Sequence, residues 1–146
     1  MNRTFLCLYN DMFLSLKQGN CYIGKSIAKP LFLLSLFDCI TSYKLRENQI
    51  KCDDCNLKEK YGEYSKRYLN KTPVVVPYYH LSSSEFYHLV WKKDFTLTLN
   101  RHTPSAKYLR EHLQYAKLDD ELWELLQDDD NREYFRRNII NRYLLK

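Results

Sequence analysis

The sequence predicts an α+β fold in which helices dominate and a small antiparallel β-hairpin or sheet is placed between them. Apolar residues recur at spacings of three and four in residues 4–17 and again after residue 119, which is typical of amphipathic helices. Residues 78–91 instead show partial alternation of apolar and polar side chains, as strands do. With 146 residues, of which 45% are hydrophobic, the chain is expected to form a single domain over residues 1–146.

The first two helices are predicted from apolar spacing and from their end signals. Residues 4–17 form the first helix, which Gly19 helps to end because glycine accepts the left-handed cap conformation. Pro30 fits the first turn of a second helix, where its missing N–H does no harm. That helix continues through the nearly all-apolar residues 31–43, and we expect it to be the central one.

A third helix and an extended segment follow. Residues 47–51 are predicted to form a short strand or a turn, after which Asp53 or Asp54 caps a helix that runs through Tyr68. Residues 72–77 contain two prolines and three valines, a composition that disfavours helix. This segment is therefore expected to be extended.

The strands are predicted in the middle of the chain. Residues 78–81 and 85–91 form the two arms of a β-hairpin around a turn of three serines, and residues 95–99 are a candidate for a third strand. The expected order is helices, then a hairpin, then helices. A winged helix is one architecture that is compatible with this order.

Three further helices are predicted towards the C-terminus. Pro104 and Ser105 open a helix that runs through Leu113. Asp119 caps the next helix, and Asn131 starts the last one.

The charge distribution favours a polyanionic partner. The formal net charge is +5, and the basic surplus lies in residues 1–118, whereas residues 119–146 are net acidic. A positive surface attracts nucleic acid, although a merely solvated surface also accounts for a surplus of this size. The chain also contains 13 tyrosines, a residue that lines both cores and the surfaces that touch bases or sugars.

Neither a membrane span nor a secretory signal is expected. The longest apolar stretch, residues 31–37, is far shorter than the roughly 20 residues that a spanning helix needs. An N-terminal apolar run at residues 5–9 is interrupted too soon to be a signal peptide. Together with five cysteines, these features predict a reduced, cytoplasmic protein with no membrane partner.

No metal or cofactor is expected. Cys52 and Cys55 have the spacing of half a zinc site, but a structural zinc needs four ligands and no second paired motif exists. Two unrelated reduced thiols are the favoured interpretation, while metal binding by this pair stays open. With only three glycines the chain has no glycine-rich phosphate loop.

No catalytic residue is predicted. The four histidines, at positions 80, 88, 102 and 112, belong to no recognisable metal-binding or nuclease motif. The acidic runs at residues 119–120 and 128–130 are interpreted as helix caps and solvated faces. The chain is therefore not expected to be an enzyme, and any nuclease activity is expected from a separate domain or partner.

Three blocks of the sequence resemble the sulfur-binding domain that precedes the HNH nuclease domain in phosphorothioate-dependent, type IV restriction endonucleases. The first block is residues 28–34 (AKPLFLL), similar to the start of a family helix; the second is residues 77–81 (PYYHL) with residues 86–89 (FYHL). The third runs from Ser105 to Leu126 and is similar to the closing helices of the family. Order and spacing agree over nearly the whole chain, and the nuclease part is absent.

The resemblance implies a module that binds phosphorothioate-modified double-stranded DNA in a bacterial restriction or defence system. In the family a proline and its neighbours form an apolar cup for the sulfur atom, and here that cup is expected from Val76, Pro77, Tyr78 and His80. Lys29 matches a basic position of the family. Further contacts to phosphates or bases are expected from Arg101, His102, Ser105, Lys107 and Arg110.

Three residues differ from the family's common pattern, and they leave an alternative function open. Val76 stands where the family commonly has Tyr, and Ile27 and Ala28 stand where it commonly has Pro and His. The alternative is a protein-interaction module of this fold that has lost DNA binding. Salt separates the two, because DNA binding weakens steeply as salt rises and apolar docking does not.

Overall fold

Helix α2 (Ala28–Thr41) is the central element of the fold. The computed structural model describes residues 3–21, 24–92 and 103–145. Almost every side chain from Ala28 to Ile40 is buried, as expected for a helix that is apolar all round. Pro30 lies in its first turn, as predicted.

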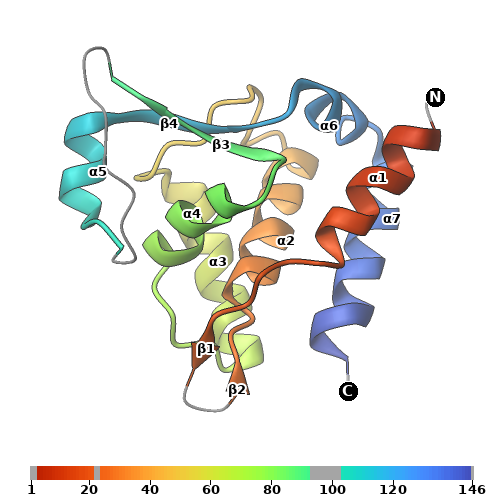
Figure 1. Cartoon of the computed structure of the whole chain (residues 1–146), viewed down its shortest axis with the longest axis horizontal. Helices are drawn as coiled ribbons and strands as arrows, with labels where there is room; N and C mark the ends of the chain where they lie inside the picture. The colour runs from red at the N-terminus through yellow and green to blue at the C-terminus, as the bar shows by residue number, and fades with distance from the viewer. Residues whose placement is uncertain (1–2, 22–23, 93–102, 146) are drawn as a thin grey trace.

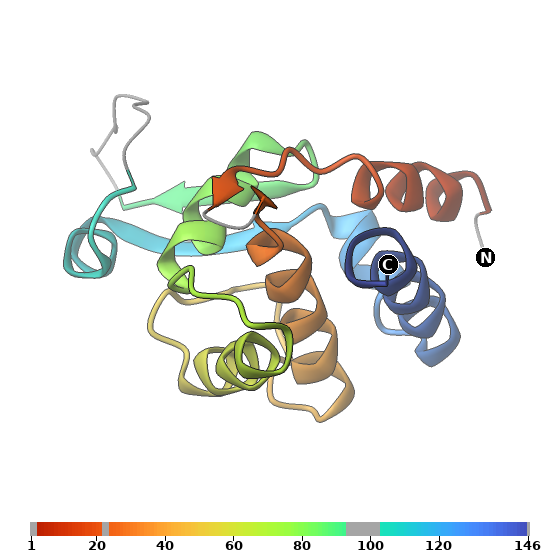
Figure 2. The same ribbon diagram turned by 90° about the horizontal axis from the view of Figure 1, so that it is seen from below.

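The other helices pack around α2. Helix α3 (Cys55–Tyr68) lies on one side of α2 and helix α7 (Asp129–Ile139) on the other (Figure 1, Figure 2). Helix α1 (Arg3–Phe13) packs against α7 and against the short helix α6 (Asp120–Leu125), and a π-helical turn (Ile140–Leu144) extends α7. No helix in the described part of the chain is both long enough and apolar enough to cross a membrane.

Three predicted cap positions are occupied by side chains of the expected kind. Asp54 precedes α3 and accepts a hydrogen bond of 2.9 Å from the Leu57 N–H, and Ser105 precedes α5 (Ala106–His112) and accepts one of 3.1 Å from the Tyr108 N–H. Asp119 is the residue before α6, but its carboxylate makes no capping hydrogen bond and instead accepts one of 2.8 Å from the Tyr9 hydroxyl. The last helix begins two residues before Asn131, because Asp128 accepts hydrogen bonds from the following N–H groups.

The main sheet pairs two strands that are distant in sequence. Strand β3 (Tyr87–Trp91) runs antiparallel to strand β4 (Leu113–Leu118), with Leu89 opposite Ala116 and an irregularity between Val90 and Trp91. Ile50 adds a short bridge to Ala116 through hydrogen bonds of 2.7 and 2.8 Å. A second pair, β1 (Asn20–Cys21) and β2 (Gly24–Lys25), forms a small ribbon before α2. The predicted helix-dominated α+β fold with a small antiparallel sheet is thus confirmed.

The predicted position of the hairpin is wrong. Residues 78–81 belong to helix α4 (Val75–His80) and to the 3₁₀ turn Leu81–Ser83, so only residues 87–91 of the predicted hairpin form a strand. The partner of this strand is β4, which begins at Leu113, a residue that the sequence predicts to lie in a helix. The third strand candidate, residues 95–99, lies outside the described residues.

The predicted extended conformation of residues 72–77 is also wrong at its C-terminal half. Pro77 occupies the first turn of α4, where no backbone N–H is needed for the helical ladder. The Tyr78 N–H donates to the carbonyl of Val74 at 3.1 Å, which completes the first turn around the proline. Val74 and Val75 pack against the core, and this tertiary burial outweighs the weak helix propensity of valine.

Buried aromatic side chains fill the core. Phe13 makes edge-on ring contacts with Phe37, Phe86 and Phe135, with centroid distances of 5.0 to 5.8 Å. Two buried tyrosines are satisfied internally, since the Tyr78 hydroxyl donates to the Ile50 carbonyl at 2.6 Å and the Tyr87 hydroxyl donates to the Tyr78 carbonyl at 2.6 Å. Part of the tyrosine content therefore serves packing.

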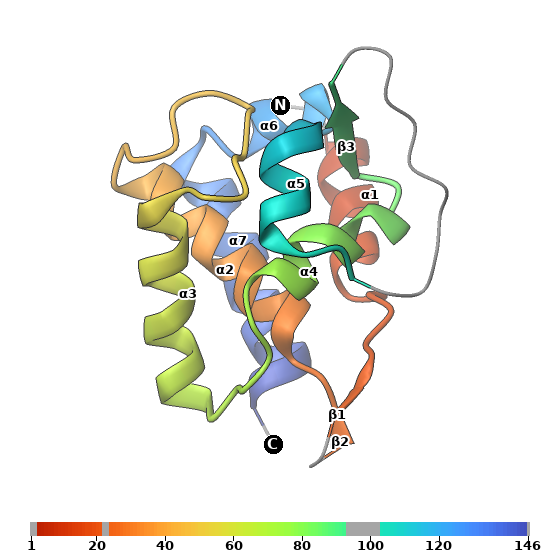
Figure 3. The same ribbon diagram turned by 90° about the vertical axis from the view of Figure 1, so that its left-hand side faces the viewer.

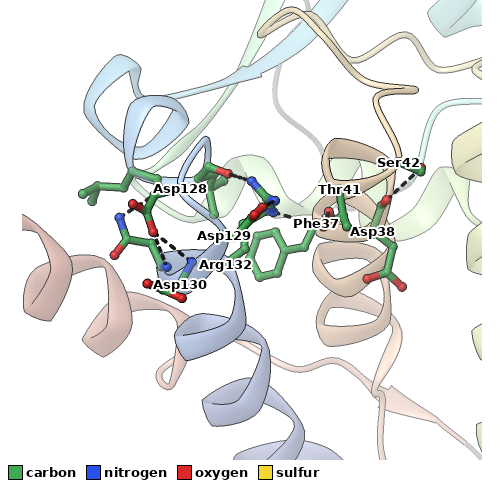
Figure 4. Close-up of polar contacts among 11 residues, drawn as sticks. Phe37, Asp38, Thr41, Ser42, Asp128, Asp129, Asp130 and Arg132 are labelled. Atoms are coloured by element: carbon green, nitrogen blue, oxygen red, sulfur yellow. Dashed lines mark hydrogen bonds and ion pairs between the residues drawn. The ribbon is translucent and has the colours of Figure 1, made fainter.

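A polar cluster, here called the α2–α7 clamp, joins the C-terminal end of α2 to α3 and α7. Arg132 is buried and donates to the Leu126 carbonyl at 2.6 Å and to the Thr41 hydroxyl at 3.0 Å, and it pairs with Asp129 (Figure 4). Arg136 pairs with Asp38 at 3.4 Å, and the Tyr64 hydroxyl donates to the same carboxylate. The clamp consists of Asp38, Thr41, Tyr64, Asp129, Arg132 and Arg136.

Candidate functional site

A hollow of about 470 Å³, here called the α4 hollow, opens between helix α4, the start of α2 and the segment that follows α1. None of the described residues that line it is acidic. They are Lys17, Gln18, Gly19, Ser26, Ala28, Lys29, Thr72, Val76, Pro77, His80 and Ser83. The hollow thus combines basic, small and apolar side chains.

One turn of α4 supplies the apolar wall of the hollow. Val76 and His80 are four residues apart and therefore lie on the same helix face, with Pro77 next to them. Pro77 is buried and Val76 is half-buried, and both line the hollow. Ala28 closes the wall from the first turn of α2.

Lys29 places a positive charge at the edge of this wall. Its Nζ donates to the backbone carbonyl of Lys17 at 2.7 Å and lies 3.4 Å from the Ser83 hydroxyl oxygen. Burial, together with repulsion from Lys17, lowers the pKa of the Lys29 ammonium group. In the described part of the chain no carboxylate forms an ion pair with Lys29, so its charge is not neutralised by the protein there.

His80 adds a titratable ring to the same wall. Its Nε2 lies 2.8 Å from the Thr103 hydroxyl, which connects the hollow to the segment before α5. Burial lowers the pKa of His80, and the nearby Lys29 lowers it further. The ring is therefore neutral at pH 7, and the wall of the hollow carries no charge from α4.

The start of α2 contributes the positive end of a helix. The Ala28 N–H donates to the Ser26 hydroxyl at 3.2 Å, and the neighbouring Gln18 side chain donates to the Ser26 carbonyl at 3.0 Å. The Ala28 N–H is thereby engaged and Pro30 has none, so this end of α2 attracts anions mainly through the partial positive charge of the helix dipole. The α4 hollow therefore offers an apolar surface beside a positively charged rim, an arrangement that suits an anion with one weakly hydrated face.

The structure brings four predicted site residues together and separates others. Lys29, Val76, Pro77 and His80 all line the α4 hollow, although they come from two distant segments. Tyr78 does not line the hollow, because it lies in the core with its hydroxyl on the Ile50 carbonyl.

The remaining predicted contacts lie on or near α5. The Ser105 hydroxyl caps that helix, Lys107 is exposed on it, and Arg110 lines a different hollow. Arg101 and His102 lie outside the described residues.

Sequence reasoning missed Lys17, Gln18, Thr72 and Ser83, which also line the α4 hollow. Lys17 and Ser83 both contact the Lys29 ammonium group, yet they are far from it in sequence. No local motif marks either residue. Within the described residues no group of three or more His, Cys, Asp or Glu side chains is placed to hold a metal ion.

Comparison with known proteins shows a likeness in fold. No protein-family model and no curated protein sequence matches the chain. A solved structure, the sulfur binding domain of ScoMcrA complexed with phosphorothioated DNA, matches with a TM-score of 0.71 at 14% identity, covering 92% of this chain and 86% of that one. A second, the sulfur binding domain and SRA domain of ScoMcrA complexed with phosphorothioated DNA, matches with a TM-score of 0.72 at 14% identity, covering 93% of this chain and 42% of that one.

The chain therefore has the fold of a sulfur binding domain. The resemblance that the three sequence blocks predicted is confirmed at the level of the fold.

Proposed function

We propose that this chain is a non-catalytic module that binds phosphorothioate-modified double-stranded DNA, with the sulfur atom seated in the α4 hollow. One observation carries the proposal. Two sequence blocks that resemble the sulfur-binding family meet around a single hollow whose described lining residues include none that is acidic. One block begins with Ala28 and Lys29, and the other begins with Pro77, contains His80 and directly follows Val76. The fold shared with the ScoMcrA sulfur binding domain supports the same function.

The chemistry of the hollow suits sulfur better than oxygen. Replacing a non-bridging phosphate oxygen by sulfur keeps the negative charge but places a larger and more weakly hydrated atom on the backbone. Against Val76 and Pro77 an oxygen would lose water without regaining hydrogen bonds, at a cost of about 1–3 kcal/mol. The apolar wall therefore discriminates between the two atoms, and it does so at a single linkage.

The positive rim supplies affinity for the charged backbone. Lys29, Lys17 and the start of α2 neutralise the phosphorothioate, and neutral His80 preserves the apolar wall at pH 7. On the flanking phosphates and bases we assign further contacts to Arg101 and His102, on the sequence resemblance alone, and to Ser105 and Lys107, which lie at the start of α5. Such contacts position the hollow over one linkage.

In this proposal the module acts in the cytoplasm of a bacterium, within a restriction or DNA-modification defence system. The chain itself supplies recognition, and a separate nuclease domain or partner supplies cleavage. Recognition by the module then directs that nuclease to modified DNA.

Binding to two duplexes of identical sequence, one with a single phosphorothioate and one without, tests the proposal. We expect the modified duplex to bind about tenfold more tightly or better, which corresponds to about 1.4 kcal/mol or more. Both affinities are expected to fall steeply as salt rises. Equal affinity for the two duplexes, or no binding to either, would contradict the sulfur function. Binding that does not weaken as salt rises would favour the alternative of a protein-interaction module.

A further inference from the structure

A second hollow, of about 450 Å³ and here called the α5 hollow, lies where the C-terminal end of α5 and the start of β4 meet the segment at residues 49–53. Three cations line it, Lys51, Lys92 and Arg110, against one carboxylate, Asp53. Gln49 and Gln114 add amide donors. The lining is thus positively charged and polar, unlike the partly apolar α4 hollow.

The backbone around the α5 hollow is held by hydrogen bonds across the sheet. Ile50 pairs with Ala116 on β4, which fixes the position of Lys51. The Lys92 N–H donates to the His112 carbonyl at 2.9 Å, and its Nζ donates to the Arg110 carbonyl at 3.2 Å. Lys92 and Arg110 are therefore tethered next to each other, so the cations lie on a fixed support.

The cations of the α5 hollow are not paired with protein carboxylates. Among the described residues no ion pair involves Lys51, Lys92 or Arg110. Asp53 offsets only part of this positive charge, so the cations repel one another and a bound anion relieves that repulsion. The hollow consequently favours a bound anion.

The positive lining continues beyond the α5 hollow. An adjoining hollow of about 290 Å³ shares Gln49 and Lys51 with it and adds Lys44 and Arg46. Its lining holds three cations against two carboxylates, Glu47 and Asp54, and Asp54 has one oxygen engaged in capping α3. An extended row of cations fits a polyanion with repeated charges better than it fits a single small anion.

We infer that the α5 hollow is a second phosphate site, which holds the DNA backbone away from the linkage read at the α4 hollow. This inference rests on the proposed function. Helices α4 and α5 both lie on the near side of the molecule in Figure 3, and the inference places one duplex across both helices from that side. The second site adds affinity that depends on neither base sequence nor sulfur.

A double variant, Lys51→Gln with Arg110→Gln, tests this inference. Its matched control is Lys66→Gln with Arg137→Gln, because both of those cations are exposed, lie in neither hollow, and leave the same net charge when replaced. Thermal unfolding verifies that both variants fold. Affinities for the modified and unmodified duplexes are then measured across a salt series.

We expect the test variant to lose roughly tenfold to 100-fold in affinity for both duplexes, since each charge-assisted contact to phosphate is worth about tenfold. The slope of log affinity against log salt is expected to decrease by about one per lost phosphate contact, while the ratio of the two affinities stays unchanged. The control variant keeps its affinity. If the test variant binds like its control, the inference is wrong.

Two further outcomes separate this inference from the proposed function. If the wild-type chain shows no sulfur preference but its DNA affinity falls in the test variant, the sulfur function fails and the second site stands. A deoxynucleoside monophosphate serves as competitor: we expect it not to displace duplex at concentrations where unlabelled duplex does. Equal displacement by the mononucleotide would identify a nucleotide pocket and overturn the backbone site.

Discussion

The two ends of helix α2 differ in whether the protein's own carboxylates neutralise the positive charges found there. At the C-terminal end, in the α2–α7 clamp, Arg132 and Arg136 are matched by Asp129, Asp38 and backbone carbonyls. At the N-terminal end, Lys29 lies beside apolar side chains and, within the described residues, donates to a carbonyl and a hydroxyl but to no carboxylate.

This difference separates stability from function along one helix. Charges that the protein itself neutralises stabilise the fold. Removing one member of such an ion pair leaves a buried group without its partner. A charge that is partly buried and yet lacks a carboxylate partner has its pKa lowered, as Lys29 does, and gains from an external anion. The clamp is therefore expected to control folding, and the α4 hollow to control binding.

Removing the buried arginine of the clamp is expected to have the largest effect. Arg132→Ala leaves the Leu126 carbonyl and the Thr41 hydroxyl without their donor, and we expect a loss of about 3 kcal/mol in the free energy of unfolding. Lys29→Ala is the matched change at the other end of α2, with an expected loss below about 1 kcal/mol. Denaturant titration measures the free energy of unfolding of both variants. Equal losses would contradict the claim that the clamp controls folding and Lys29 does not.

Placing a carboxylate in the α4 hollow is expected to have the next largest effect. Val76→Asp sets a negative charge against the incoming phosphorothioate and removes the apolar wall, so we expect affinity for the modified duplex to fall by about 100-fold. Leu8→Asp adds the same charge on the exposed outer face of α1 and serves as control. Fluorescence anisotropy measures the affinities for the modified duplex. Similar losses of affinity in both variants would show that the α4 hollow is not the binding site.

Neutralising Lys29 separates the contribution of its positive charge to DNA affinity from the contribution of the apolar wall to sulfur preference. Lys29→Gln is expected to weaken binding of modified and unmodified duplexes alike, by roughly tenfold, because it removes a cation but not the wall. The preference for sulfur is expected to remain. A selective loss for the modified duplex alone would assign sulfur discrimination to the lysine.

The smallest expected effect concerns the pH dependence set by His80. Burial and Lys29 lower its pKa in the free protein, so the folded state binds fewer protons than the unfolded state as pH falls below about 6.5. The free energy of unfolding should then decrease through that window. A bound anion favours the protonated ring, so DNA affinity should rise a few-fold over the same window. His80→Gln should flatten both trends in pH-resolved titrations, and unchanged trends would show that another group is responsible.

Features that depend on neighbouring residues could be predicted from the sequence. The Asp54 cap, the Ser105 cap and the position of Pro30 in a first helical turn follow from local hydrogen bonding and backbone geometry. The resemblance to a known family predicted a sulfur cup of Val76, Pro77, Tyr78 and His80 and a phosphate contact at Lys29. All of these except Tyr78, which lies in the core, line the α4 hollow.

Features that depend on distant partners could not be predicted in this way. Leu109 and Leu113 have helical spacing, yet Leu113 begins strand β4 because β3 offers it backbone partners. Helix α4 forms despite its valines because Val74 and Val75 pack against the core. Ser83 joins the α4 hollow only after folding brings it near Lys29.

A crystal structure of the chain with a duplex carrying one phosphorothioate tests the central claim most directly, because anomalous scattering locates the sulfur atom. The α4 hollow predicts that this sulfur lies in van der Waals contact with Val76 and Pro77, at about 3.5–4.0 Å from their carbon atoms, with the Lys29 ammonium group on the same linkage. A sulfur atom that points to solvent, or that lies in the α5 hollow beside Arg110, would contradict it.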